Sequence, residues 1–455
     1  MTSATAEPTR RPVDALVFEI GSTTTVVSAF GGFGGDGDSG GPRLIAQGFA
    51  PTSVAQGDVG IGLDAARTQL EAVTGPLAPT VTLATSSAAG GLRMTVHGLT
   101  QRMTAMAARE AALGAGAVVE YTTAGLLRDG DLRRIEEIAP SLILLAGGVE
   151  GGDSETVLHN AERIATLSVR PIVVYGGNST VAGEVRALLE GAGFRFRATR
   201  NVYPGIDELD IVPARAVIHD AFEEHITHAP GMEALAKTVT GRILPTPGAV
   251  LLAAEALADA VGDLVVVDVG GATTDVHSVT DGAPEISAIA TEPEPHSKRT
   301  VEGDLGTFVS ARHVAELLPE AQRPETLPPA IPTTAEEIEV AVTLARTAAV
   351  TGVHRHAGSL LQLYTPTGRQ TVARGRDLTA CRILIGTGGA LTRLPGGTAI
   401  LEATRAGSSA GEKLLPPSDA QTTLDRDYVF ACCGALLAHF DTNAVVALMR
   451  RSTGL

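Results

Sequence analysis

The feature that most constrains the fold is a short motif that occurs twice. Residues 15–30 read ALVFEIGSTTTVVSAF, and residues 264–279 read LVVVDVGGATTDVHSV. Each copy is an apolar strand that ends near an acidic residue, turns through glycine and hydroxyl residues, and continues as a second strand. Two copies predict two lobes of related plan, each built on a β-hairpin. Aligning the acidic residues Glu19 and Asp268 places Gly21 on Gly270, Thr24 on Thr273 and Thr25 on Thr274.

The two turns have the chemistry of phosphate-binding loops. Backbone N–H groups in a tight turn can converge on phosphate oxygens, and glycine lets a ligand approach closely. Hydroxyl side chains add further donors. A strand rather than a helix follows each turn, which distinguishes the motif from a P-loop. The candidate phosphate-binding residues are Gly21, Ser22, Thr23, Thr24, Gly270, Gly271, Thr273 and Thr274.

The acidic residues beside these turns predict a metal site. Bare carboxylates at Glu19 and Asp268 would repel a polyphosphate. A divalent cation removes this conflict, because Mg²⁺ binds through one or two carboxylates together with phosphate oxygens. We therefore predict that both acids bind Mg²⁺ and that ATP lies between the hairpins. Asp275 is a candidate for ordering metal-bound or attacking water, so Asp275, Asp268 and Glu19 are the predicted catalytic residues.

Composition narrows the possible partners. The chain has 455 residues, of which 44% are hydrophobic and only 3% aromatic, so its cores must be built from Ala, Val and Leu. The formal net charge of −16 argues against a nucleic-acid or membrane partner, because either needs a basic patch. No apolar run is long enough to span a membrane and the first residues are polar, so we expect a cytoplasmic protein. The oligomeric state is left open.

Strand and helix patterns divide the chain into three parts. Residues 1–13 are predicted to be a disordered tail, residues 14–240 a first lobe, and residues 241–455 a second lobe. Within the first lobe, apolar strands alternate with helical segments, which predicts inserted βα units and a mostly parallel sheet. One long helix is predicted over residues 335–361. The three cysteines form no metal-ligand pattern and are interpreted as small core residues.

The paired motifs resemble those of the actin, sugar-kinase and heat-shock-chaperone ATPase superfamily. This resemblance implies an α/β, two-lobed, actin-like (ribonuclease H-like) ATPase fold with a nucleotide cleft between the lobes. ILIGTGGAL resembles the adenosine motif and VEGDLGTFVSARHV a segment near the nucleotide. ILPTPGAVLLAAEAL and ACCGALLAHFD resemble the two connecting helices, and Gly434 would let them cross closely. The nucleotide residues so implied are Gly303, Gly386, Gly388 and Gly389.

A closer resemblance extends over most of the chain. The ordered set GGLRMTVHGLT, LILLAGGVEGGDSETVLHNAE, VVVDVGGATTDVHSV and RTVEGDLG is similar to the glutamate mutase accessory proteins called MutL or GlmL. The resemblance implies an ATP-dependent reactivating factor, and its partner would be an adenosylcobalamin-dependent mutase such as glutamate mutase or an aminomutase. One position departs from the superfamily, because Glu19 stands where Asp is usual.

Two other functions remain open at this point. A small-molecule kinase of the same superfamily would need a substrate pocket with a base near the γ-phosphate, and no residue outside the phosphate motifs is assigned to that role. A nucleotide-binding scaffold without turnover is kept open by the Glu19 departure. An activator that holds a [4Fe–4S] cluster is disfavoured, because the cysteines are poorly placed for it.

Overall fold

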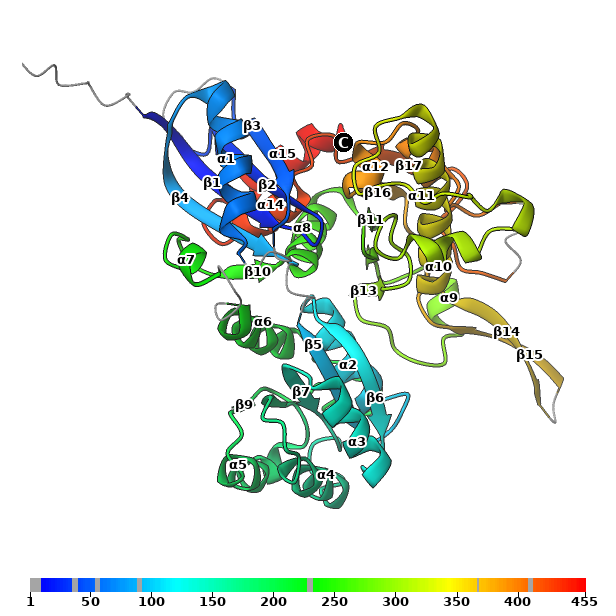
Figure 1. The fold of residues 1–455 in the computed structure, drawn as a ribbon. Coiled ribbons are helices and arrows are strands. Elements are labelled where there is room, and N and C mark those ends of the chain that lie inside the picture. The colour runs from blue at the N-terminus through cyan, green and yellow to red at the C-terminus, as the bar shows by residue number, and fades with distance from the viewer. Residues whose placement is uncertain are drawn as a thin grey trace, which may run out of the picture.

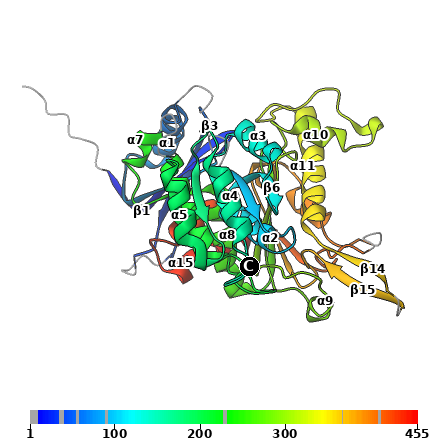
Figure 2. The same cartoon turned by 90° about the horizontal axis from the view of Figure 1, so that it is seen from below.

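The computed structural model describes residues 10–34, 40–53, 58–87, 92–226, 232–365, 368–407 and 412–455. These ranges form three five-stranded sheets and a separate two-stranded hairpin (Figure 1). Two of the sheets belong to the lobes that the repeated motif predicted. The third sheet forms a domain of its own, which lies below the two lobes in Figure 1 and in front of them in Figure 2.

The first sheet has the strand order β3-β2-β1-β4-β10. Strands β1, β2 and β3 are antiparallel neighbours, whereas β4 runs parallel to β1 and β10 runs parallel to β4. Helix α1 (Gly60–Thr74) packs against β3, and Gly48 makes this possible because a β-carbon there would collide with the α1 backbone. The strands are β1 (Arg11–Ile20), β2 (Thr24–Gly31), β3 (Arg43–Pro51), β4 (Leu77–Ser86) and β10 (Ile243–Pro245).

The second sheet repeats this plan with the order β13-β12-β11-β16-β17. Its strand directions are the same, with β11, β12 and β13 antiparallel and with β16 and β17 parallel to β11. The predicted two-lobed, actin-like (ribonuclease H-like) fold is therefore confirmed. The strands are β11 (Leu264–Val269), β12 (Thr274–Val279), β13 (Ser297–Glu302), β16 (Ile383–Thr387) and β17 (Gln421–Leu424); the helices are α9 (Pro284–Ser287), α10 (Ala311–Glu316), α11 (Ala335–His356), α12 (Gly389–Thr392) and α13 (Gly397–Glu402).

The inserted βα units form the third sheet, and we refer to residues 93–198 as the inserted domain. All of its strands are parallel, as predicted, in the order β6-β5-β7-β8-β9. This is the 2-1-3-4-5 order of a doubly wound domain. The strands are β5 (Arg93–Gly98), β6 (Val118–Ala124), β7 (Leu142–Leu145), β8 (Ile172–Tyr175) and β9 (Phe196–Ala198); the helices are α2 (Thr104–Gly114), α3 (Asp129–Ile138), α4 (Glu155–Ala165) and α5 (Ala182–Gly191).

Helices between the lobes join the two motif-bearing sheets. α6 (Val212–Ile226) and α7 (Met232–Ala236) lead from the inserted domain back to β10. α8 (Thr246–Val261), α14 (Phe430–Leu436) and α15 (Thr442–Thr453) share one hydrophobic core with β1 and β11. Cys432 and Cys433 lie in this core and Cys381 in the core of the second lobe, all of them buried and unpaired, as interpreted from the sequence.

Some predicted boundaries need correction. The tail predicted over residues 1–13 is too long, because Arg11–Val13 already pair with Leu77–Pro79 in the first sheet; residues 1–9 lie outside the described ranges. The helix predicted over 335–361 ends at His356, because Gly358 and the following residues enter the hairpin of β14 (Ser359–Thr365) and β15 (Gly368–Arg374).

The lobe boundary predicted after residue 240 stays a prediction, although β10 still pairs in the first sheet. None of the described helices is both long enough and apolar enough to cross a membrane.

The crossing of α8 and α14 provides a test of the packing. A β-carbon at Gly434 would lie 2.7 Å from the α-carbon of Ala249. We expect Gly434→Ala to lower the free energy of unfolding by about 1–3 kcal/mol, because overpacking forces the two helices apart. Urea denaturation measures this change. Gly183→Ala in α5 is the control: its β-carbon meets nothing within 4 Å, so it should be neutral or stabilising by about 0.5–1 kcal/mol. Equal midpoints for the two variants would contradict a tight crossing.

Candidate functional site

The two motifs form the same turn, as their alignment predicted. In the first, the Gly21 N–H donates to the Thr24 carbonyl oxygen at 3.0 Å; in the second, the Gly270 N–H donates to the Thr273 carbonyl oxygen at 2.9 Å. The acids occupy equivalent places, since Glu19 and Asp268 each stand one residue before the end of the first strand.

The two turns touch each other across the cleft. A β-carbon at Gly271 would lie 2.9 Å from the γ-methyl carbon of Thr23. The second turn is held from behind by the segment after β13: the Thr274 hydroxyl donates to the Leu305 carbonyl at 2.5 Å, and the Phe308 N–H donates to the Gly271 carbonyl at 2.9 Å. The predicted phosphate residues therefore come together, although the Thr274 hydroxyl is already used.

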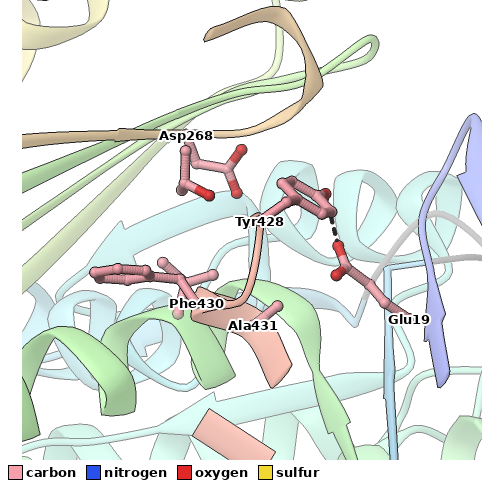
Figure 3. Close-up of a pocket in the computed structure, with 7 residues that line it drawn as sticks. Glu19, Asp268, Tyr428, Phe430 and Ala431 are labelled. Atoms are coloured by element: carbon pink, nitrogen blue, oxygen red, sulfur yellow. Dashed lines mark hydrogen bonds between the residues drawn. The ribbon is translucent and has the colours of Figure 1, made fainter. Parts of the chain in front are cut away.

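A small cavity lies where the two acids converge. Figure 3 shows the Tyr428 side chain between Glu19 and Asp268, and its hydroxyl donates to Glu19 Oε1 at 2.8 Å. The cavity holds about 10 Å³, room for roughly one water molecule. A cavity of this size is too small for a nucleotide. The lining residues are Glu19, Val250, Asp268, Thr387, Tyr428, Phe430 and Ala431.

The electrostatics of this cavity are unfavourable to two carboxylates. Burial raises the pKa of Glu19 to about 7; the Tyr428 hydrogen bond opposes this rise and the charge of Asp425 adds to it. Burial also raises the pKa of Asp268 well above its usual range, and the charges of Asp275 and Glu19 raise it further. Glu19 Oε2 is buried and has no hydrogen-bond partner among the described residues. The charge of Arg393 opposes the shift at Glu19 and that of Arg299 opposes the shift at Asp268, but the net shift of each pKa is upward.

These observations fit the predicted cation. An orphaned carboxylate oxygen, two acids on facing strands and a cavity of water size are the donors and the space that Mg²⁺ uses. Within the described ranges no cluster of three or more His, Cys, Asp or Glu residues could hold a metal by itself. The phosphate oxygens of a nucleotide would therefore have to supply further ligands.

The third glycine turn also reaches the acids. Gly388 has φ +84°, and a β-carbon there would lie 2.5 Å from the Val269 carbonyl oxygen, so this position requires glycine. Gly389 begins α12 with open space beside it, and Gly303 lies exposed after β13. Gly386 faces Leu391, Leu401 and Leu424 instead, which gives it a packing role. The nucleotide contacts predicted for these glycines stay predictions.

Asp275 lies in a different environment from the other two acids. It pairs with Asp268 across β11 and β12 and is only 5% exposed. Its Oδ1 accepts from Arg299 Nε at 2.8 Å and its Oδ2 accepts from the Thr273 hydroxyl at 3.1 Å. The equivalent position in the first hairpin is Val26, which pairs with Glu19. The repeat therefore supplies a second acid on one side of the cleft only.

Sequence reasoning missed the loop that presents Tyr428. Asp425 is buried at its start and accepts hydrogen bonds from the Val429 and Phe430 amides, which caps α14. Tyr428 follows with φ 51°, a left-handed conformation that is rare for a residue with a side chain. The guanidinium of Arg393 lies 5.8 Å from its ring centroid. The one available signal was the polar run DRDY (residues 425–428) shortly before the second connecting helix.

Comparison with known proteins assigns the chain to a family. A family model described as "MutL protein" matches residues 15–453. Protein MutL of Clostridium tetanomorphum is 37% identical over 393 residues, which span 80% of this chain and 84% of that protein. The chain belongs to the MutL family.

Solved structures that align with the chain are much more distant. One is a diol dehydratase-reactivating factor in its nucleotide-free form, 12% identical, with a TM-score of 0.36 over 93% of this chain and 99% of that one. Another is xylulose kinase from Bifidobacterium adolescentis, 12% identical, with a TM-score of 0.28 over 96% of this chain and 93% of that one. Scores this low do not distinguish between functions.

The raised pKa of Glu19 predicts that the free energy of unfolding depends on pH. The pKa is about 7 in the folded protein and 4.5 ordinarily, so the stability that protonated Glu19 contributes is fully present below pH 4.5. This contribution is lost as the pH rises through 7. Above pH 7, Glu19→Gln should therefore have a free energy of unfolding higher than that of the wild type by up to about 3 kcal/mol, measured by urea denaturation. Below pH 4.5 the two proteins should have the same free energy of unfolding. Glu285→Gln, at an exposed glutamate of α9, is the control. An advantage that is the same at every pH would contradict an ionisable Glu19 in the cavity.

Proposed function

We propose that this protein is an ATP-dependent reactivating factor for an adenosylcobalamin-dependent mutase such as glutamate mutase or an aminomutase. The observation that carries the proposal is the pairing, between lobes of duplicated fold, of two phosphate-type turns with two buried acids whose pKa values are raised. Membership of the MutL family supports the choice of partner, and the fold supports the nucleotide.

The residues of the cleft would divide the work of binding. Glu19 and Asp268 would hold Mg²⁺, which supplies charge neutralisation for the phosphates. The amides and hydroxyls of the two turns that are not already bonded within the protein would donate to the phosphate oxygens from opposite sides. Tyr428 must leave its place between the acids for this to occur, since its hydroxyl donates to Glu19. Gly388 would leave room for the nucleoside beside Asp268.

Such a cleft can do mechanical work on a partner. Turns that contact each other directly must separate to admit a nucleotide and can close again around it. Lobe positions then depend on whether the γ-phosphate is present, and a partner that binds the two arrangements unequally is shifted between its own conformations. Opening a mutase that retains a damaged cobalamin needs this kind of bias.

A nucleotide-binding scaffold without turnover is the second candidate. The observation that favours it is the state of Asp275, whose Oδ1 is occupied by a buried arginine. A carboxylate held in this way is restricted in ordering an attacking water. Glu19 in place of the more usual Asp points in the same direction. Hydrolysis measurements separate this candidate from the first.

Asp268→Ala tests the nucleotide site. Calorimetry on the purified protein should show ATP binding that weakens when EDTA removes Mg²⁺ and that falls at least tenfold, about 1.4 kcal/mol, in Asp268→Ala. The variant removes one of two carboxylates that hold the cation. Asp281→Ala, at a side chain that is 82% exposed in the same lobe, should bind as the wild type does. Unchanged affinity in Asp268→Ala would overturn the metal assignment.

Reactivation can be measured directly with a mutase. Mutase inactivated with hydroxocobalamin is incubated with this protein, fresh adenosylcobalamin, and either ATP or a non-hydrolysable analogue. Recovery of mutase activity with ATP only is expected, because hydrolysis drives the cycle between two states of unequal affinity. Recovery without nucleotide would contradict the proposed reactivating function, as would no recovery with any candidate mutase of the same genome. The nucleotide-binding scaffold and the small-molecule kinase would then remain as candidates.

A further inference from the structure

A fully buried arginine joins the candidate nucleotide site to the inserted domain. Arg299 on β13 is 1% exposed. Its Nε and Nη2 lie 2.8 and 2.5 Å from Asp275 Oδ1. Its Nη1 donates to the carbonyl oxygens of Leu113 at 2.9 Å and Ala117 at 3.1 Å. One guanidinium therefore contacts the predicted catalytic acid and a backbone segment of another domain.

The carbonyls that Arg299 reaches lie at the end of α2 and just after it. The last carbonyls of a helix carry the negative end of its dipole, so a cation stabilises them. Leu113 lies in the last turn of α2 and its carbonyl also accepts from the Gly116 N–H at 2.9 Å, and Ala117 comes directly before β6. Moving Arg299 would remove a charged donor from both carbonyls, and losing a hydrogen bond to a buried acceptor is costly.

Neighbouring residues fix the same junction. Lys298 Nζ lies 3.6 Å from Glu110 of α2, a residue that is 2% exposed. The Ser297 hydroxyl and carbonyl accept from Arg215 of α6 at 3.0 and 2.6 Å. Gly114, the last residue of α2, leaves room for the Arg215 guanidinium. Lys298 and Arg299 of β13 thus bind the second lobe to the inserted domain, and Ser297 binds it to α6. Arg299 also contacts Asp275 of the candidate site.

We propose that Arg299 is a positioning residue that couples Asp275 to the end of α2, so that the inserted domain responds to what occupies the cleft. A buried guanidinium needs its counter-charge, and a change at Asp275 must alter how Arg299 divides its hydrogen bonds. Coupling is reciprocal, so a molecule that binds the inserted domain changes nucleotide affinity by the same factor. The nucleotide part of this inference rests on the proposed function, but the link between Asp275 and α2 does not.

The link is tested first without nucleotide, by hydrogen exchange of the full chain. Neutralising Asp275 by Asp275→Asn should speed amide exchange in residues 111–118 by about tenfold or more, whereas α5, at the far end of the inserted domain in Figure 1, stays unchanged. In an Arg299→Lys background, Asp275→Asn should raise the exchange rate at residues 111–118 by less than about twofold. The reason is that a lysine cannot hydrogen-bond to Asp275 and to both carbonyls at once, so the link is already broken. No change at 111–118, or an equal change in both backgrounds, overturns the link.

A matched substitution guards against a general loosening of the fold. Arg376 is also buried in the second lobe, at 2% exposed, and donates to Ser278 and to the carbonyls of Pro295 and His296. Arg376→Lys should leave exchange at residues 111–118 within about twofold of the wild type. If Arg376→Lys raised the exchange rate at residues 111–118 as much as Arg299→Lys does, then loss of any buried arginine would have this effect. That result would overturn the specific role of Arg299.

Mg²⁺–ATP supplies the second arm. Saturating nucleotide should change exchange at residues 111–118 in the wild type, and Arg299→Lys should keep ATP affinity within about fivefold by calorimetry while losing that change. If the wild type binds ATP and residues 111–118 do not respond, the inference fails and the proposed function stands. If ATP does not bind but Asp275→Asn still loosens 111–118, the proposed function fails and the Asp275–Arg299–α2 link stands.

Discussion

The contact of Gly434 with Ala249 sets how close the two lobes can come. Each lobe has its own sheet, and neither sheet can bring its hairpin turn to the other unless the helices between them cross tightly. With no side chain at Gly434, α14 lies against the backbone of α8, and both helices enter a core that contains β1 and β11. The acid-bearing ends of those two strands then line one cavity, and Thr23 touches Gly271. The geometry of this cavity therefore depends on the backbone contact between α8 and α14.

Bringing the two lobes together buries Glu19 and Asp268 near each other, which has an electrostatic cost. This cost can be lowered in two ways. Burial makes ionised Glu19 and Asp268 unfavourable, and the charge of Glu19 raises the pKa of Asp268 further. In the closed arrangement the cost falls if Glu19 takes up a proton and accepts the Tyr428 hydroxyl. A divalent cation would lower it more strongly, but it would compete with Tyr428 for the space. If the cation binds as proposed, it and the tyrosine are alternatives, and the cavity filled by Tyr428 and the cavity that holds the cation would be two distinct states of the same residues.

Local pattern was sufficient to predict the parts of this structure that repeat. The hairpins, their acids and the order of apolar strands follow from period-two patterning and from turn residues, which act over short stretches of chain. Tyr428 and Arg299 could not be found in this way. Tyr428 reaches Glu19 from 409 residues away, and Arg299 reaches Leu113 from 186 residues away, so neither contact leaves a local trace. The helix predicted to run to residue 361 fails for a related reason: only the hairpin partner shows that residues 359–365 are a strand.

One topologically equivalent connection differs strongly between the two halves of the repeat. Between β16 and β17 the chain forms two short helices, whereas between β4 and β10 it forms the whole inserted domain, α6 and α7. By chain order this domain belongs to the first lobe, and its hydrophobic core is continuous with that of the first sheet. Yet Arg299 and Lys298 attach it to the second lobe. Because the inserted domain is attached to both lobes, any separation of the lobes must either strain the junction on β13 or move the inserted domain. Because Arg299 at that junction also holds Asp275, lobe motion and the acid of the second turn are mechanically connected.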